Sequence, residues 1–99
     1  MKVYDMKAKD IVLKLLQNDE LSRTFQALAK LQWGAIGRIA REARLSLTTT
    51  RQRLEELEQM GLAAKISMGE NGNTPLNGYY RLTEQGFHYK KIVLPLVTT

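Results

Sequence analysis

The segment from Trp33 to Leu82 constrains the fold of this chain more than any other part. Its first half contains two short stretches in which apolar residues recur every three or four positions, as they do on one face of a helix. Only three residues, Leu45-Ser46-Leu47, separate the two stretches. Two strand-like stretches follow, with a loop rich in Gly and Asn between them. The segment therefore predicts a helix-turn-helix, whose second helix is a slim, rigid rod, followed by a β-hairpin.

The two helices of this pair have recognisable faces and ends. Ser46 is a suitable N-cap for the second helix, because its hydroxyl can accept a hydrogen bond from a free amide in the first turn. Gly61 stands where a helix often ends in a left-handed residue, so we expect the second helix from about Leu47 to Met60. The first helix is short, and its buried face is expected to consist of Ile36, Ile39, Ala40 and Ala43.

One edge of the second helix should be buried and the opposite edge exposed. Helical geometry directs Thr48 and Gln52 away from the core. Thr49 and Arg53 fall on one flank of this exposed edge, and Arg51 falls on the other. The buried stripe is expected to consist of Leu47, Thr50, Leu54 and Leu57.

Three further helices flank the helix-turn-helix. A leader helix is expected at about residues 6–17, and a second amphipathic helix runs from Glu20 to Leu31. After the hairpin, Thr83 caps a last helix. This helix should end near Pro95, because the residue before a proline avoids the helical region.

The hairpin and the chain length complete the expected architecture. The strands are expected at Leu62–Met68 and Gly78–Leu82. A chain of 99 residues suits one domain over 1–99, with a core at about 20–90 and an apolar C-terminal extension at about 91–99. The expected fold class is mainly α with a small antiparallel β-hairpin, an α+β arrangement.

Aromatic residues near the hairpin have distinct expected roles. Tyr79 and Tyr80 alternate faces in a strand, so one of them should fill the core while the other faces solvent. Trp33 is expected to pack between helices rather than to stack on a base.

Positive charge concentrates on the helix pair. The chain has a formal net charge of +5 and a sequence pI near 9.7, which favours a polyanionic partner. From Arg38 to Arg53 there are five arginines and one acid, Glu42, which gives +4. The positions that follow carry three acids, so the front of the second helix is cationic and its back end is acidic. The alternative is that the arginines form only a solvated surface, with Glu42 paired to Arg38 one helical turn away.

Three stretches of the chain resemble parts of the winged-helix regulators of bacteria and archaea. Ile39–Ser46 resembles their helix-turn stretch, and Arg53–Leu62 resembles the end of their recognition helix. Tyr80–Gly86 resembles their second wing strand with the start of the helix after it. In this order and spacing the stretches are similar to MarR, PadR and ArsR-type regulators, over roughly residues 21–89. The resemblance implies a winged helix-turn-helix with an extra N-terminal helix, and it does not select one of the three families.

The same resemblance implies a protein that reads a sequence in double-stranded DNA, usually as a dimer on a palindromic site. Gln can form two hydrogen bonds with adenine, Arg can do so with guanine, and the Thr methyl group can touch the thymine methyl group. Carried over by position, the base-reading residues are Thr48, Thr49, Gln52 and Arg53. Contacts with the phosphate backbone, which position a protein without reading sequence, are expected from Arg38, Arg41, Arg44, Arg51, Lys65 and Arg81.

The loop of the hairpin departs from this family pattern. Wing tips in these regulators often carry Arg or Lys for the minor groove, whereas Gly69–Asn77 contains no basic residue and one acid, Glu70. The candidate wing-tip contacts are therefore Asn71 and Asn73, against the DNA backbone. The alternative is a wing that does not touch DNA.

Both ends of the chain are apolar. Two apolar segments that flank one small domain predict a homodimer in which these ends pack on a second copy. The alternative is that they complete the core of a single copy. The residues expected at the dimer interface are Ile11, Val12, Leu15, Leu16, Ile92, Val93 and Leu96.

Several classes of site are not expected. The chain has no cysteine and one histidine, His88, so we expect neither a metal site nor a cofactor. No nucleophile–base pair can be assembled from the sequence, so we do not expect an enzyme. No apolar run reaches the roughly 20 residues that span a bilayer, and the N-terminus does not resemble a signal peptide. We expect a cytoplasmic, nucleoid-associated protein of a prokaryotic, archaeal or virus-infected cell, and the sequence leaves any small-molecule effector unknown.

The leading hypothesis from the sequence is a sequence-specific, DNA-binding transcription regulator that represses its targets as a homodimer. A winged-helix module for protein–protein interaction is the alternative, because the wing loop lacks basic residues and the chain ends are apolar. A third hypothesis is a non-specific architectural DNA-binding protein. Salt distinguishes these classes, since DNA binding driven by counterion release weakens steeply as the salt concentration rises.

Overall fold

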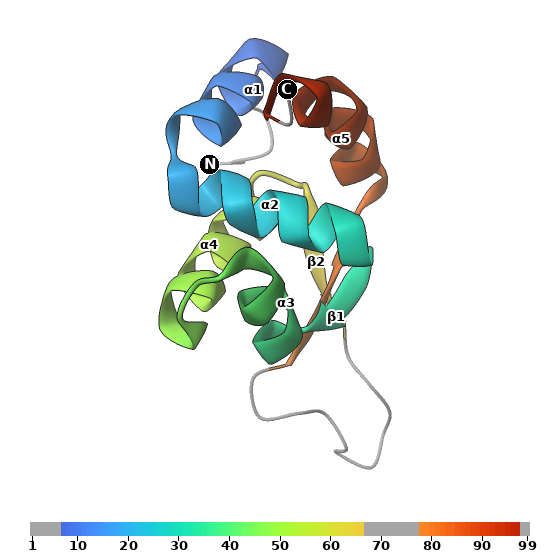
Figure 1. Ribbon diagram of the computed structural model, residues 1–99. Coiled ribbons are helices and arrows are strands. Elements are labelled where there is room, and N and C mark those ends of the chain that lie inside the picture. The colour runs from blue at the N-terminus through green and yellow to red at the C-terminus, as the bar shows by residue number, and fades with distance from the viewer. Residues whose placement is uncertain (1–6, 67–77, 98–99) are drawn as a thin grey trace.

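A computed structural model describes residues 7–66 and 78–97 of the chain. Five helices and three strands lie within these residues (Figure 1). The wing-tip candidates Asn71 and Asn73 lie outside the described residues. In chain order the elements are α1 (Ala8–Gln17), α2 (Asp19–Leu31), β1 (Trp33–Ala35), α3 (Ile36–Ala43), α4 (Leu47–Gln59), β2 (Ala63–Ile66), β3 (Tyr79–Leu82) and α5 (Glu84–Val97).

The helices form two groups around α2. Helices α1 and α5 lie together on one side of it, and α3 and α4 lie on the other (Figure 1). α2 contacts each of the other four helices and also β1 and β3. Its side chains Leu21, Phe25 and Leu28 are fully buried. α2 is therefore the central element of the core, and it fixes the position of the helix-turn-helix formed by α3 and α4.

The sheet confirms the expected α+β class and adds a strand that the sequence pattern did not predict. The strands are antiparallel and lie in the order β1-β3-β2. The β2–β3 pair is the hairpin expected from the sequence. β1 pairs with β3 through Trp33–Ala35, so a segment that precedes the helix-turn-helix closes one edge of the hairpin.

The two faces of the sheet have opposite environments. Gly34 lies opposite Tyr80, and Trp33 lies opposite Arg81. A Cβ atom at Gly34 would meet side chains of α2 and α3, so this row faces the helices. Tyr80 is accordingly 1% exposed, whereas Trp33 is 52% exposed on the outer face. The predicted alternation of Tyr79 and Tyr80 is confirmed, and the expectation that Trp33 packs between helices is wrong.

Parts of α1 and α5 complete the core of the single chain. Ile11 and Leu15 of α1 and Val93 of α5 are at most 2% exposed and belong to the main core cluster. The prediction that these three residues line a dimer interface is corrected, because the packing of α1 on α2 and α5 covers them within one copy. α5 also runs past its predicted end near Pro95 and reaches Val97.

The chain passes from α3 into α4 through a short, well-defined turn. Arg44 adopts a left-handed conformation with a φ of 59°, which ends α3. Ser46 then caps α4 as predicted, since its Oγ accepts a hydrogen bond from the Thr49 amide at 3.1 Å. At the far end of α4 the chain turns at Gly61, whose φ of 81° suits a residue without a Cβ atom.

A second corner holds the start of α5 against the end of α4. The Thr83 hydroxyl donates a hydrogen bond to the Gly61 carbonyl at 2.6 Å and accepts one from the Gly86 amide at 3.0 Å. A Cβ atom on Gly86 would overlap the Leu62 carbonyl oxygen and the Leu82 side chain. Only glycine therefore fits this position without a shift of the backbone.

We expect Gly86→Ala to lower the free energy of unfolding by about 1–3 kcal/mol, the usual cost of overpacking a close contact. Gly37→Ala is the matched control, because no atom lies within 4 Å of a Cβ placed on this helical glycine. The control should be neutral or stabilising by about 0.5–1 kcal/mol, because alanine favours the helix. Urea unfolding followed by circular dichroism measures both values, and equal effects of the two substitutions would contradict the close packing at Gly86.

Candidate nucleic-acid interface

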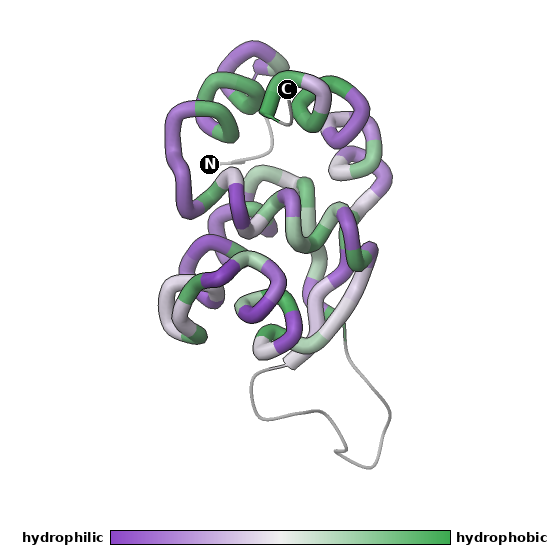
Figure 2. The backbone as a smooth tube through the Cα atoms, viewed as in Figure 1, coloured by the Kyte–Doolittle hydropathy of each residue, from purple (hydrophilic) through white to green (hydrophobic). Residues whose placement is uncertain are grey.

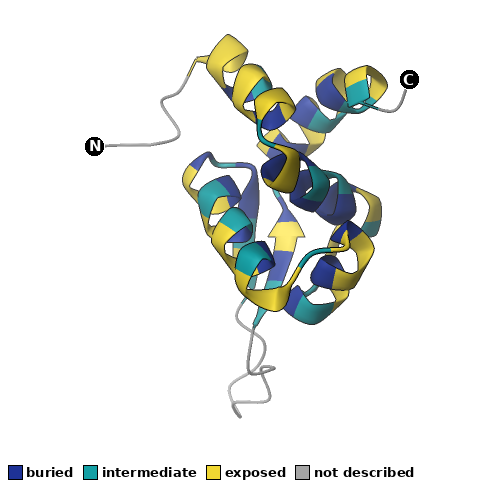
Figure 3. Ribbon diagram, turned by 60° about the vertical axis from the view of Figure 1, so that its left-hand side comes forward, coloured by how far each residue is buried: buried dark blue, intermediate teal, exposed yellow. Residues whose placement is uncertain are grey.

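α4 buries one edge and exposes the other (Figure 3). Thr50, Leu54 and Leu57 are fully buried, while Thr48 and Gln52 are exposed. This division matches the helix faces predicted from the sequence at all five positions. Leu47, predicted to be buried, is 42% exposed, because it stands at the first residue of the helix before the buried stripe begins.

The two flanking residues of this edge lie in different surroundings. Thr49 is half-buried, and its amide is held by the Ser46 cap. Arg53 is also half-buried, and its guanidinium is engaged by two carboxylates: Nη1 donates to Glu56 Oε2 at 2.7 Å, and Nε lies 3.8 Å from Glu20 Oε1. The guanidinium of Arg53 is therefore held toward α2 and is not part of the exposed edge formed by Thr48 and Gln52.

Exposed cations lie on both helices of the helix-turn-helix. Arg38 and Arg41 are exposed on α3, and Arg51 is exposed on α4. Glu42, the one acid between Arg38 and Arg53, pairs with a cation of another helix: it accepts a hydrogen bond from Lys30 of α2 at 2.9 Å. The predicted alternative of a Glu42–Arg38 pair is thus not what the structure shows.

The strands contribute two more exposed cations, Lys65 on β2 and Arg81 on β3. Lys65 Nζ lies 5.9 Å from the centre of the Tyr80 ring, which holds the ammonium beside the base of the hairpin. Burial raises the pKa of the Tyr80 hydroxyl, and the charges of Glu58 and Glu55 add to this effect. The phenol therefore stays neutral at physiological pH, and the positive charge at this place comes from the lysine.

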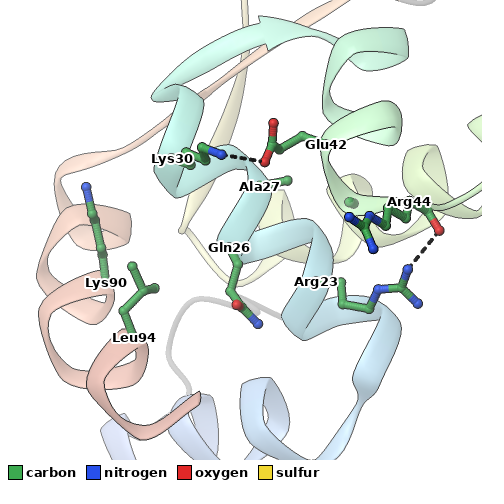
Figure 4. A pocket seen from close by; sticks show the side chains of 9 residues that line it. Arg23, Gln26, Ala27, Lys30, Glu42, Arg44, Lys90 and Leu94 are labelled. Carbon is green, nitrogen blue, oxygen red and sulfur yellow. Dashed lines mark hydrogen bonds and ion pairs between the residues drawn. The ribbon is translucent and has the colours of Figure 1, made fainter. Parts of the chain in front are cut away.

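Arg44 belongs to a different surface, which the sequence did not predict. It lines an open groove of about 580 Å³ formed by α2, the end of α3 with the turn that follows it, and α5 (Figure 4). Its carbonyl accepts a hydrogen bond from Arg23 at 2.8 Å, and its side chain lies along the groove beside α2 (Figure 4). Lys30 and Lys90 line the same groove.

The floor of this groove is apolar. Ala27, Ala43 and Leu94 contribute to its lining between the four cations and Glu42. Lys90 donates a hydrogen bond to the Ala29 carbonyl at 3.3 Å, which holds α5 near α2. The residues that form the groove are far apart in the sequence, so periodicity within one helix carried no signal for it.

Apolar side chains remain exposed on the pair of terminal helices. Leu16 is 39% exposed on α1, and Ile92 and Leu96 are 39% and 55% exposed on α5. Val12 is half-buried against the core. The sequence prediction did not include Leu13, which is 47% exposed. Figure 2 shows hydrophobic stretches on α1 and on the C-terminal half of α5, whereas α4 is mainly hydrophilic.

Within residues 7–66 and 78–97, no group of three or more His, Asp or Glu side chains is placed to hold a metal ion. No helix in this part of the chain is long and apolar enough to cross a bilayer.

No protein-family model and no curated protein sequence matches the chain. Solved structures do resemble it. The structure described as NadR in complex with 4-hydroxyphenylacetate has a TM-score of 0.69 and 18% sequence identity, over 88% of this chain and 60% of that chain. A MarR family transcriptional regulator from Silicibacter pomeroyi has a TM-score of 0.68 and 18% identity, over 92% of this chain and 60% of its own.

The chain thus spans about 60% of the length of each of these neighbours. At this level of identity the likeness establishes the fold. The fold expected from the sequence resemblance is confirmed: the chain is a winged helix of the kind found in MarR family regulators.

Proposed function

We propose that this chain binds double-stranded DNA and acts as a transcription regulator. The observation that carries the proposal is the exposed edge of α4, which presents Thr48 and Gln52 while its leucine edge is buried. An α-helix fits the major groove of B-form DNA, where each base pair offers a distinct pattern of donors and acceptors. The likeness to regulators with the same fold supports this use of the helix.

In this proposal the residues divide into two roles. Thr48, Thr49 and Gln52 read base edges, because they lie on or beside the exposed edge of α4. The exposed cations of α3, α4 and the hairpin strands meet phosphates and supply attraction that does not depend on sequence. These cations are Arg38, Arg41, Arg51, Lys65 and Arg81. Arg44 is assigned to the groove instead, because its side chain lies there (Figure 4).

We expect Gln52→Ala to reduce the preference for a selected duplex over a scrambled one by roughly 1–3 kcal/mol, because a bidentate base contact is lost. Arg41→Gln should instead weaken binding to both duplexes alike and lower the magnitude of the salt slope by about 0.9. The duplex is first selected from a random pool, and both variants are then titrated at several salt concentrations. Binding by both variants that equals the native protein would contradict the assignment of α4.

The same measurement separates the competing functions. Affinity that is equal for unrelated duplexes would indicate an architectural DNA-binding protein. Absence of DNA binding, together with self-association that persists at about 0.5 M salt, would indicate a protein-interaction module, since counterion-driven binding weakens steeply over this range. Repression is proposed as the outcome because a protein seated on a promoter blocks access to it.

The proposed regulator is a homodimer joined through the terminal helices. The exposed apolar side chains Leu13, Leu16, Ile92 and Leu96 of α1 and α5 lie on the opposite side of α2 from α3 and α4. An exposed apolar patch of this kind is typical of an interface between proteins. A dimer formed there would leave both copies of α4 open to DNA, which suits a palindromic site.

We expect Leu16→Lys combined with Leu96→Lys to convert the dimer into a monomer, because two buried charges per copy would face an apolar interface. Leu47→Lys is the matched control, since Leu47 is similarly exposed at 42% but lies on α4. Sedimentation equilibrium without DNA measures the mass. A native protein that is monomeric at high concentration would contradict the dimer.

The groove supports a second proposal, that the regulator binds an organic anion as its effector. Four cations, Arg23, Lys30, Arg44 and Lys90, surround an apolar floor in the groove, which suits a carboxylate on an aromatic or aliphatic body (Figure 4). The neighbour NadR is described in complex with 4-hydroxyphenylacetate, which is such a molecule. An anion that pairs with Arg23 would compete with the Arg44 carbonyl, and so would act on the turn that leads into α4.

We expect 4-hydroxyphenylacetate to bind in calorimetric titrations, and Arg23→Gln to weaken this binding by about tenfold or more, because a charge-assisted hydrogen bond is lost. Arg81→Gln is the matched control, since Arg81 lies on β3, outside the groove. The neutral 4-hydroxyphenylacetamide should bind weakly. Equal binding of the acid and the amide would contradict recognition by the cations.

A further inference from the structure

Arg53 occupies a position between two helices that its sequence context did not predict. The resemblance to winged-helix regulators assigned it to base reading, on the same flank of α4 as Thr49. In the structure its side chain is 21% exposed and meets carboxylates from two elements. Glu56 lies one turn further along α4, and Glu20 belongs to the first turn of α2. The guanidinium therefore connects the recognition helix to the helix on which it packs.

The contacts of Arg53 argue against its reaching a base in the major groove. Arg53 Nε is buried and has no hydrogen-bond partner among the described residues, and its nearby counter-charge is Glu20 at 3.8 Å. Withdrawing the guanidinium toward DNA would separate it from Glu20 and Glu56 together. Both carboxylates would then lie without a cation beside a partner that is itself negative. Loss of one member of a partly buried ion pair is costly, because the remaining charge loses its compensation.

Glu20 lies at a corner of the fold that joins three helices. Asn18 ends α1 and also caps α2, since its Oδ1 accepts a hydrogen bond from the Leu21 amide at 3.0 Å. Glu20 follows two residues later, so the Arg53 contact ties α4 to the junction of α1 and α2. The apolar surface that we propose for the dimer begins on this same α1.

We infer that Arg53 is a positioning residue: it fixes the orientation of the recognition helix on α2 through Glu20 and Glu56, and it leaves base discrimination to Thr48, Thr49 and Gln52. This inference rests on the proposed function. In this view Arg53, although it lies on the recognition helix, contacts other parts of the domain and not DNA. It also gives α1 a physical connection to the DNA-reading surface, through the Asn18 corner and Glu20.

The test compares Arg53→Gln with Arg41→Gln and Gln52→Ala on a selected duplex and a scrambled duplex, over a range of salt concentrations. We expect Arg53→Gln to weaken binding to the selected duplex more than to the scrambled one, because a helix that can shift on α2 loses contacts with the bases. On single-base variants of the selected duplex, this loss should be spread over the base pairs of the site, whereas Gln52→Ala should lose preference at one base pair. The salt slope should be unchanged, whereas Arg41→Gln should lower its magnitude by about 0.9. A fall in the salt slope for Arg53→Gln, or a loss of preference confined to one base pair of the site, would overturn the inference, because either result marks a direct DNA contact.

Glu20→Gln gives a second test, because the inference and its alternative predict opposite changes in DNA affinity relative to a control variant. Removing a carboxylate near DNA normally strengthens binding, and Glu55→Gln on the exposed surface of α4 is the matched control for this effect. If Glu20 holds Arg53 in place, Glu20→Gln should bind the selected duplex more weakly than Glu55→Gln does. If Glu20 only restrains an arginine that reads DNA, Glu20→Gln should bind the selected duplex more tightly than Glu55→Gln does. That result would overturn the inference.

A measurement without DNA separates this inference from the proposed function. Urea unfolding of Arg53→Gln, Glu20→Gln and the double variant forms a double-mutant cycle, with Glu55→Gln in place of Glu20→Gln as the control cycle. Coupling between positions 53 and 20 that exceeds the control supports the tie between α4 and α2 even if the native protein binds no duplex. Coupling no larger than the control overturns it, whatever the DNA titrations show.

Discussion

The burial of the leucine edge of α4 against α2 is the contact on which the rest of the molecule depends. Leu54 and Leu57 are fully removed from solvent, together with Phe25 and Leu28 of α2. This apolar contact sets which side of α4 faces outward, because a helix can bury only one edge against one neighbour. The same α2 carries α1 and α5 on its other side. Burial of four such side chains contributes about 1.5–3 kcal/mol each, so the contact that orients α4 is also a main source of stability.

The sequence predicted those features that repeat within a single element. The buried positions Thr50, Leu54 and Leu57 follow from helical spacing, and the Ser46 cap and the Gly61 turn follow from local backbone chemistry. Features that require two distant segments were missed. β1 has three residues and one of them is glycine, so its pairing with β3 left no alternation for the sequence to reveal.

The same limit applies to the candidate site. Helical geometry placed Gln52 on the exposed edge correctly, because exposure depends on α4 alone. It could not place Arg53, whose surroundings depend on Glu20, 33 positions earlier in the chain. The groove likewise combines Arg23, Arg44 and Lys90 from three separate elements. The fold separates the five arginines that the sequence shows as one cluster: three are exposed on α3 and α4, one lines the groove, and one lies against α2.

The exposed Trp33 has a practical consequence. It is the chain's single tryptophan, and it stands on the outer face of the sheet, 6.0 Å from the Tyr79 ring. Its indole emission therefore reports on one known place, with excitation energy passed to it from the neighbouring phenol. Native tryptophan fluorescence can therefore report binding or structural change at the hairpin base without an attached dye. Changes confined to α1 and α5, on the far side of α2, should not alter this emission.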